Sequence, residues 1–359
     1  MATLAEQFRR HAEQMTGLYR VLLLGLAEDW DRSGVTREVC RDWEDAPPSA
    51  LVQLRLLAGL HRIVLTGRAP DLGRFYPDVG GRDDPGQAWP VAREVIGRHV
   101  AELRAALDIA PQTNEPGRAV ALLVGLFDAL ERSGLHRIRL FEPGASAGLN
   151  LLVDRFRIEG SDPEAWGYGP LDSPLRLVDA VIGPVRPQAF TIVERAGCDL
   201  SPVDALSEQG RLRLVSFVWP DQLDRHARLQ AALAIAADTV TEADTISAVH
   251  VDRAPAGKWL RQRLGTAPGP QTLTVVWHSV TRGYWPASEV QASSAAIAAA
   301  AERMPIAEIA MESSPESPGR TAELTVSIGG PGRSAPEPRR LGAVADHGVP
   351  VRLDGTVRS

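Results

Sequence analysis

The chain has 359 residues, a formal net charge of -6 at pH 7, 44% hydrophobic residues and 23% charged residues. This length predicts about two domains, and the composition is that of a globular protein rather than a disordered or fibrous one. The acidic balance argues against nucleic acid as a partner, because neutralising phosphates requires clustered lysines and arginines.

The sequence contains no run of about 18 apolar residues, so it predicts no membrane span, and the N-terminal sequence lacks the apolar core of a secretory signal. The two cysteines, Cys40 and Cys198, lie too far apart in the sequence to predict a zinc motif. We therefore expect a cytoplasmic protein with no membrane partner and no metal.

Residues 1–135 carry helical patterns throughout. Apolar residues recur every three or four positions, as at Leu18, Leu22 and Leu26, and turn-rich breaks separate the patterns. No segment of this region reads as a strand. We predict an all-helical N-terminal module over residues 1–135 that covers a ligand site and selects the substrate.

The pattern changes at residue 136, where short β-like runs begin to alternate with helical patterns at 222–237 and 290–303. Such alternation predicts an α/β fold with a mostly parallel sheet. The last two runs, 321–329 and 340–353, predict an antiparallel C-terminal strand pair at the sheet edge. The other expected strands lie at 137–141, 190–194, 212–218, 246–251, 273–277 and 306–311.

The strongest local signal is the segment Glu142-Pro-Gly-Ala-Ser-Ala-Gly-Leu-Asn150, which follows the first expected strand and precedes a helical pattern over residues 149–156. Gly144 permits a sharp turn, and Gly148 lets the next helix begin close to a ligand. Glu142 would repel a pyrophosphate at this position, but it suits a cationic cofactor with an amino group, such as S-adenosylmethionine.

The same segment also fits a nucleophile elbow, because residues 144–148 read G-x-S-x-G with Ser146 as the nucleophile. The acid and the base would follow in chain order, as Asp221 or Asp252 and then His278 or His347. An α/β-hydrolase, however, has several strands before its nucleophile, whereas residue 137 opens the sheet here. We favour the cofactor loop, and a plain turn of small residues is the structural alternative.

Five long segments of the chain are similar to one uncharacterised bacterial family, the domain-of-unknown-function family DUF2332. The similarity covers nearly the whole sequence, and the second half resembles Rossmann-like S-adenosylmethionine-dependent methyltransferases. This resemblance implies a Rossmann-like methyltransferase domain over residues 136–359. The segments are 112–118, 141–156, 195–204, 218–232 and 275–280.

The methyltransferase resemblance implies that the cofactor lies at the glycine-rich loop and that Asp199 binds its ribose. Ser146 stands where many methyltransferases have a glycine, and the long gap before Asp199 makes 157–189 an insertion. Asp199 also fits a simple turn cap before Ser201. The cofactor-binding candidates are Glu142, Gly144, Ser146, Gly148, Asn150, Asp199, Asp252 and Trp277.

Trp277, His278 and Ser279 end a further expected strand, and ligands of open α/β sheets bind at the carboxyl ends of strands. We therefore expect these side chains to face the cleft. His278 is the candidate general base for the proton lost by the methyl acceptor, although a lone histidine is more often structural.

Two polar segments are candidates for the substrate pocket. Thr113 or Asn114 can cap the helix that follows, but capping does not explain the other polar residues of that segment. In the second segment a helix start with a surface ion pair between Asp221 and Arg225 is the favoured alternative. The pocket candidates are Gln112, Thr113, Asn114, Glu115, Arg118, Trp219, Asp221 and Gln222.

The sequence thus predicts an S-adenosylmethionine-binding enzyme that methylates an O or N atom of a small molecule. One alternative is a methyltransferase-like protein that binds a ligand or a partner without catalysis. The other is the Ser146 hydrolase. The sequence predicts no particular oligomeric state.

Overall fold

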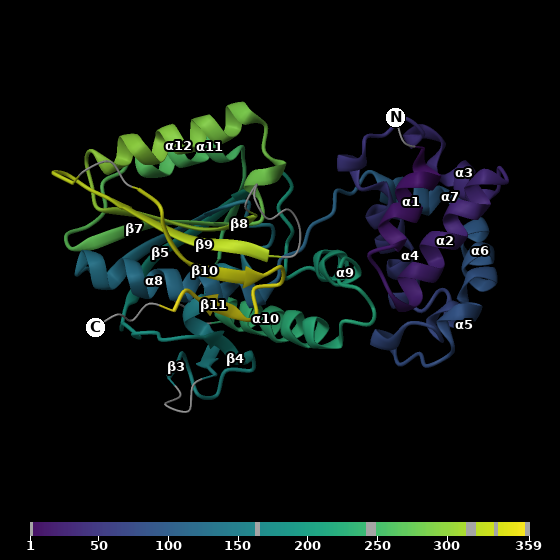
Figure 1. The fold of residues 1–359 in the computed structure, drawn as a ribbon, viewed down its shortest axis with the longest axis horizontal. Coiled ribbons are helices and arrows are strands. Elements are labelled where there is room, and N and C mark those ends of the chain that lie inside the picture. The colour runs from purple at the N-terminus through teal and green to yellow at the C-terminus, as the bar shows by residue number, and fades with distance from the viewer. Residues whose placement is uncertain (1–2, 162–165, 242–248, 314–320, 334–336, 356–359) are drawn as a thin grey trace. The chain divides into compact units, whose positions relative to one another are not determined.

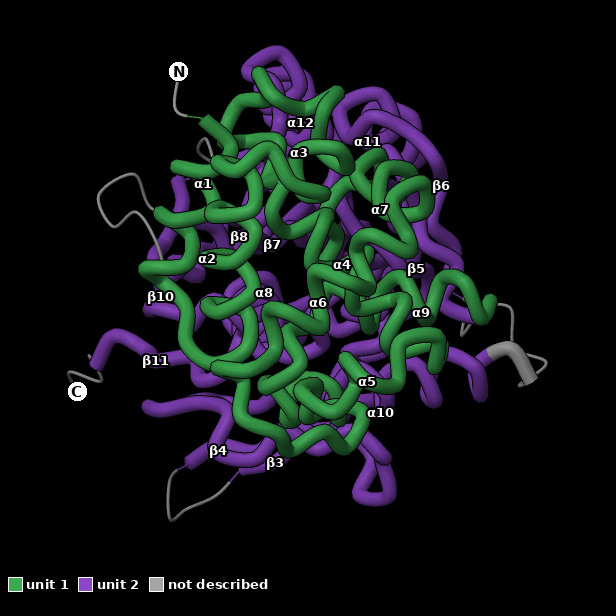
Figure 2. The backbone as a smooth tube through the Cα atoms, turned by 90° about the vertical axis from the view of Figure 1, so that its right-hand side faces the viewer, with its two compact units in different colours: residues 1–113, 207–227 green, residues 114–206, 228–359 purple. Residues whose placement is uncertain are grey.

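The computed structural model describes residues 3–161, 166–241, 249–313, 321–333 and 337–355. The chain forms two compact units (Figure 2). Unit 1 comprises residues 1–113 and 207–227, and unit 2 comprises residues 114–206 and 228–359. The boundary therefore differs from the expected one at residue 135, because 114–135 belong with the sheet and a later segment joins the helical unit.

Unit 1 is helical in its described residues, as the apolar periodicity predicts. The stripe of Leu18, Leu22 and Leu26 is buried in a continuous core. Its helices are α1 (Leu4–Ala12), α2 (Gly17–Asp31), α3 (Val35–Cys40), α4 (Val52–Leu65), α5 (Pro70–Gly73), α6 (Ala88–Arg98), α7 (Val100–Leu107) and α9 (Glu208–Ser216).

Helix α9 corrects the strand expected at 212–218. The side chain of Ser207 caps the helix by accepting a hydrogen bond from the backbone N–H of Gly210 at 3.0 Å. Leu214 and Val215 are buried on this helix. An alternation of arginine and leucine over a few residues resembles a strand locally, but the cap and the burial of adjacent residues stabilise a helix.

Unit 2 is built around one mixed sheet of eleven strands in the order β3-β2-β4-β11-β10-β9-β8-β7-β1-β5-β6. Strand β1 opens this sheet, as expected. The strands are β1 (Arg137–Pro143), β2 (Arg157–Gly160), β3 (Gly167–Tyr168), β4 (Arg176–Ile182), β5 (Thr191–Asp199), β6 (Val251–Arg253), β7 (Thr272–Ser279), β8 (Ile306–Ser313), β9 (Thr321–Gly329), β10 (Arg339–Ala345) and β11 (Val351–Leu353).

Five neighbouring strands, β6-β5-β1-β7-β8, run parallel to one another. After β1 the chain first forms β2, β3 and β4 at the far edge of the sheet, and it then adds β5 and β6 on one side of β1 and β7 and β8 on the other. The winding direction therefore reverses between β1 and β7. At such a reversal the connections after two adjacent strands leave in opposite directions, and the carboxyl ends lie side by side.

Helices cover both faces of this parallel region (Figure 1). One face carries α8 (Ala119–Ser133), whose Gly125 packs directly on Ile309 of β8. The other carries α11 (Ala256–Leu264) and α12 (Ala287–Ala301), which form a core with Phe141 and Val276. The remaining helix of the unit is α10 (Leu223–Thr241), which begins in the segment assigned to unit 1.

Two further expectations are corrected by the structure. Strands β9 and β10 are antiparallel as predicted, but they lie inside the sheet rather than at its edge. The reason is that residues 157–189 form β2, β3 and β4, which pair beyond β11. Residues Leu149–Arg155 form the 3₁₀ turn η6 instead of an α-helix.

Strand β6 overlaps the run expected at 246–251 at its last residue, and residues 246–248 of that expectation lie outside the described residues. Within the described part of the chain, no helix has the length and apolarity that crossing a membrane requires.

Candidate functional site

The glycine-rich loop after β1 is a tight turn in which three residues adopt left-handed backbone angles. The φ values are +80° at Gly144, +55° at Ser146 and +74° at Gly148. A non-glycine residue rarely adopts this conformation, so the loop stores strain at Ser146. Backbone strain of this kind persists where the surrounding structure enforces it.

The end of β5 holds this loop in place. The backbone N–H groups of Gly144 and Ala145 donate to the carbonyl of Cys198 at 2.7 and 3.0 Å. The carboxylate of Asp199 accepts from the backbone N–H of Ser146 at 3.0 Å and from that of Ser201 at 2.8 Å. Asp199 therefore caps two turns at once beside the loop, and its bond to Ser201 is the turn cap that we gave as the alternative to ribose binding.

The two glycines of the loop are required by contacts within the protein itself. A Cβ atom added to Gly144 would lie 2.4 Å from Oγ1 of Thr281, and one added to Gly148 would lie 2.4 Å from Cγ1 of Val249. Gly144 makes the turn that we expected, and at Gly148 the close approach that we expected from a ligand is made by a neighbouring side chain.

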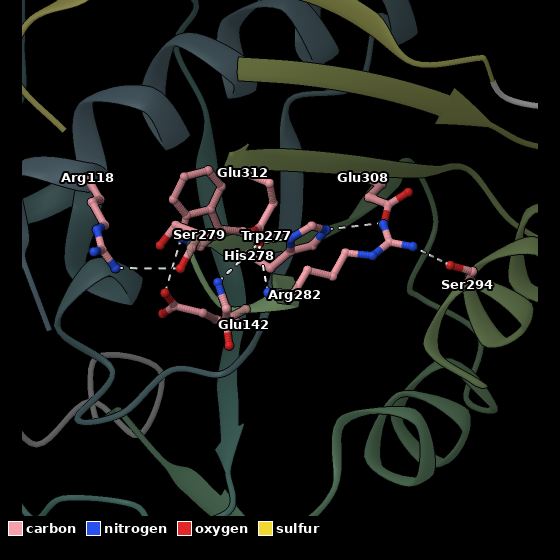
Figure 3. Close-up of polar contacts among 10 residues, drawn as sticks. Arg118, Glu142, Trp277, His278, Ser279, Arg282, Ser294, Glu308 and Glu312 are labelled. Carbon is pink, nitrogen blue, oxygen red and sulfur yellow. Dashed lines mark hydrogen bonds and ion pairs between the residues drawn. The ribbon is translucent and has the colours of Figure 1, made fainter. Parts of the chain in front are cut away.

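Glu142 is buried at the carboxyl end of β1, with 2% of its surface exposed. Its Oε1 accepts a hydrogen bond from Nε1 of Trp277 at 3.1 Å (Figure 3), and the Asn150 side chain lies close enough to this carboxyl group to favour its charged form. Burial raises the pKa of Glu142 to about 8, although the Trp277 bond and the charge of Arg118 oppose the increase.

Three buried oxygen atoms at this site have no hydrogen-bond partner among the described residues. They are Oε2 of Glu142, Oγ of Ser146 and Oδ1 of Asn150. Buried polar atoms are nearly always paired in folded proteins, so each of these atoms requires a water molecule or a ligand as its partner. All three can accept a hydrogen bond, and therefore the site is complementary to a proton donor.

Successive residues of a strand point to opposite faces, and this alternation separates Trp277 from His278. Trp277 lies on the α8 face with Glu142, whereas His278 follows Val276 on the α12 face. The sequence led us to expect both side chains in one cleft. The structure brings together Trp277, Glu142 and Asn150, and it places the His278 ring in a different cluster.

His278 lies between two carboxylates of β8 (Figure 3). Its Nδ1 is 2.7 Å from Oε1 of Glu312, and its Nε2 is 3.3 Å from Oε1 of Glu308. Burial alone would lower the pKa of His278, but these two hydrogen-bonded carboxylates raise it to about 9. An imidazolium accepts no proton, so this geometry argues against the general-base role expected for His278.

Asp252, one of the expected cofactor-binding residues, is bonded to α11 and to the residue that precedes its strand. Its Oδ2 accepts from Nε1 of Trp259 and from Arg263, both at 2.7 Å, and its Oδ1 is 2.8 Å from the His250 ring. Although burial opposes the change, these bonds lower the pKa of Asp252 to about 2. The geometry gives Asp252 a structural role at the edge of the sheet.

Three of the pocket candidates in the segment before α8 lie in unit 2. Oδ1 of Asn114 accepts from the backbone N–H of Leu149 at 2.9 Å, and Nη1 of Arg118 lies 3.5 Å from the carbonyl of Ser279. Glu115 performs the capping expected of Thr113 or Asn114, since its carboxylate accepts from the N–H of Gly117 at 3.2 Å. Asn114 and Arg118 thus border the loop site.

The other pocket candidates belong to unit 1. Gln112 and Thr113 end its first segment, and Trp219, Asp221 and Gln222 lie in the segment that returns to it. Trp219 packs on Tyr19 with ring centroids 6.2 Å apart. Arg225 donates to Gln222, whereas we had expected an ion pair with Asp221.

Sequence reasoning missed Glu308, Glu312 and Thr281. The two glutamates are four residues apart in an apolar run, a spacing that places both on one face of a strand. That spacing was a usable signal, but the sequence does not reveal that β8 pairs with β7. Thr281 carries no signal of its own.

Other regions of the described chain are weaker candidates for a functional site. A groove of about 610 Å³ in unit 2 lies against α8, β10 and β11, and none of the loop-site residues line it. Among the residues in the described ranges, no group of three or more His, Cys, Asp or Glu side chains is arranged to hold a metal ion.

The fold and the site together define a mixed α/β protein with a helical unit and a buried, acceptor-rich site at the carboxyl end of its central strands. The sequence model of the family described as "Uncharacterized protein conserved in bacteria (DUF2332)" matches residues 2–352, so the chain belongs to this family. No curated protein and no solved structure matches the chain.

Proposed function

We propose that unit 2 is a Rossmann-like methyltransferase domain that binds S-adenosylmethionine at the loop after β1 and methylates an O or N atom of a small molecule. The winding of β6-β5-β1-β7-β8 supports this proposal, because doubly wound sheets bind ligands where the winding direction reverses. The Glu142–Asn150 loop lies at that reversal.

The observation that carries the proposal is the set of three unpaired acceptor oxygens at Glu142, Ser146 and Asn150. A phosphate would bring further acceptors to these atoms and would oppose the ionisation of Glu142. A protonated amino group brings three donors and a positive charge. S-adenosylmethionine carries such a group and no phosphate, so the residues fit this cofactor better than a dinucleotide.

Asp199 supplies the second half of the proposed cofactor site. Each of its carboxylate oxygens accepts one backbone N–H, and a carboxylate at this end of β5 is the group that would accept hydrogen bonds from the ribose hydroxyls. When bound, the cofactor would supply a methyl group activated by its sulfonium. The protein residues would contribute binding and alignment, which are the main requirements of such a transfer.

Non-catalytic binding is the second candidate function, and the protonated state of His278 favours it. An imidazolium held by Glu308 and Glu312 does not remove a proton from a methyl acceptor. The hydrolase alternative lacks comparable support, because no described imidazole is bonded to the Ser146 hydroxyl and β1 is the first strand of the sheet.

Calorimetric titration with S-adenosylhomocysteine, which retains the amino group, tests the proposal. Because the pKa of Glu142 is raised to about 8, binding of an ammonium group near pH 7 should release a proton. The measured enthalpy should therefore depend on the ionisation enthalpy of the buffer. Asp199→Ala should weaken binding, and Glu142→Gln should abolish the buffer dependence.

The surface variant Glu131→Gln is a matched control that removes a carboxylate from the exposed end of α8. It should bind as the wild type does. Absence of binding to the wild-type protein would refute both the methyltransferase and the non-catalytic proposals. Binding without methyl transfer to any of a panel of small alcohols, phenols and amines would favour the non-catalytic one.

A further inference from the structure

The segment Ser279–Arg282, which leaves the end of β7, adopts an unusual conformation. Val280 has a φ of +47°, in the left-handed region that a β-branched residue rarely occupies. Its backbone N–H donates to the carbonyl of Met311 at 2.8 Å. A conformation of this kind is unfavourable by itself, so neighbouring contacts must hold it.

Glu312 provides these contacts. Its Oε1 accepts the hydrogen bond from Nδ1 of His278 and lies 3.3 Å from the backbone nitrogens of both Thr281 and Arg282 (Figure 3). One carboxylate oxygen therefore joins the His278 ring to the strained segment. The hydrogen bonds are charge-assisted, which makes them stronger than neutral ones.

The other side of the segment borders the loop site. A Cβ atom added to Gly144 would lie only 2.4 Å from Oγ1 of Thr281. The carbonyl of Ser279 faces Nη1 of Arg118 at 3.5 Å. Any displacement of the segment would therefore change the surroundings of the glycine-rich loop and of Arg118.

We propose that His278 and Glu312 are positioning residues, which act from the α12 face of the sheet to hold Ser279–Arg282 against the glycine-rich loop. The structural part of this inference stands on contacts in unit 2 alone. Its consequence for ligand affinity rests on the proposed function. This inference gives His278 a role in shaping the site instead of the proton-transfer role that the sequence led us to expect.

The charges around the ring make this arrangement dependent on pH. His278 faces Glu308 and Glu312 from β8, the Trp285 ring is 6.3 Å away, and Arg282 pairs with Glu308 at 3.5 Å while donating to Ser294 of α12. The positive charges of His278 and Arg282 balance the negative charges of Glu308 and Glu312. Loss of the ring proton, with the pKa at about 9, would leave one excess negative charge.

Hydrogen exchange of the backbone amides in residues 279–285 tests the inference without a ligand. Glu312→Gln and Glu308→Gln are a matched pair, since each removes one carboxylate from His278 but only Glu312 contacts the Thr281 and Arg282 amides. We expect exchange of these two amides to rise about tenfold or more in E312Q and to change little in E308Q.

A pH series and a rescue variant supply readouts that a general loss of stability would not move. In the wild type, protection of these amides should fall as the pH passes through about 9, after correction for intrinsic exchange, and E312Q should show no such step. Val280→Gly relieves the unfavourable backbone angle, so it should restore part of the protection in E312Q.

Equal exchange in E312Q and E308Q, or the absence of rescue by Val280→Gly, would overturn the inference. If both predictions hold and S-adenosylhomocysteine binds, its Kd should rise more in E312Q than in E308Q. If they hold but the wild type binds no S-adenosylhomocysteine, the positioning role stands and the proposed function fails.

Discussion

Replacing Glu142 with glutamine should stabilise the ligand-free protein above neutral pH, although it removes a residue of the proposed site. The carboxyl group is buried, and its pKa rises from 4.5 to about 8 on folding. A carboxyl group whose pKa is raised in the folded state opposes folding once the pH exceeds its value in the unfolded chain. Glutamine does not ionise and carries no such penalty.

The magnitude follows from the two pKa values. The interval from 4.5 to about 8, at about 1.4 kcal/mol per pH unit, gives a difference of at most about 5 kcal/mol between the variant and the wild type. The difference should be small near pH 5, grow steadily as the pH rises, and level off above about pH 8. The variant keeps the hydrogen bond from Trp277 to Oε1, so the pH dependence of the difference reports only the charge of Glu142.

Urea unfolding of both proteins over this pH range, followed by circular dichroism, measures the difference in unfolding free energy. The surface variant Glu131→Gln controls for the loss of one carboxylate. A difference between E142Q and wild type that stays constant with pH would refute the reasoning, because it would mean that Glu142 titrates alike in the folded and unfolded chains.

The remaining predictions concern the glycine-rich loop. Gly144→Ala should lower the unfolding free energy by about 3 kcal/mol or more, since its Cβ would lie 2.4 Å from Thr281 in a left-handed conformation. Gly134→Ala, also left-handed but with no atom within 4 Å of the added Cβ, should lower it by only about 1 to 2 kcal/mol, and equal losses would contradict the contact with Thr281. Ser146→Ala should change the unfolding free energy by less than about 1 kcal/mol, because the hydroxyl has no described partner, and should leave any esterase turnover unaltered; loss of turnover would revive the hydrolase. Asp199→Asn should lower the unfolding free energy by about 1 to 2 kcal/mol, since an amide replaces one of two oxygens that accept backbone N–H groups, and unchanged thermal stability would remove Asp199 from its role in holding the loop.

Several features of the site were predictable from local sequence. The run at 137–141 ends at a loop whose glycines turn the chain, and both the strand and the left-handed glycines follow from side-chain patterning and backbone sterics. The placement of Glu142 and Asn150 beside this loop follows as well, because they belong to the same short segment. Asp199 was placed there by the resemblance, at the end of the neighbouring strand.

The features that the sequence did not reveal depend on how distant segments pair and pack. Residues 157–189 looked like an insertion, and yet their strands extend the sheet beyond β11. The segment 207–227 belongs to the helical unit, where Trp219 packs against a core that begins at residue 4. Pairing between distant segments depends on contacts that no local window contains, and tertiary packing overrides weak local preferences.

The sequence by itself determined the helical first region, the strand that opens the sheet and the polar loop that follows it, because periodicity and glycine placement act over a few residues. The tertiary structure decided which carboxylates surround His278 and which face of the sheet its ring occupies. Those outcomes depend on β8 lying next to β7, since only that pairing brings Glu308 and Glu312 to a ring about thirty residues away.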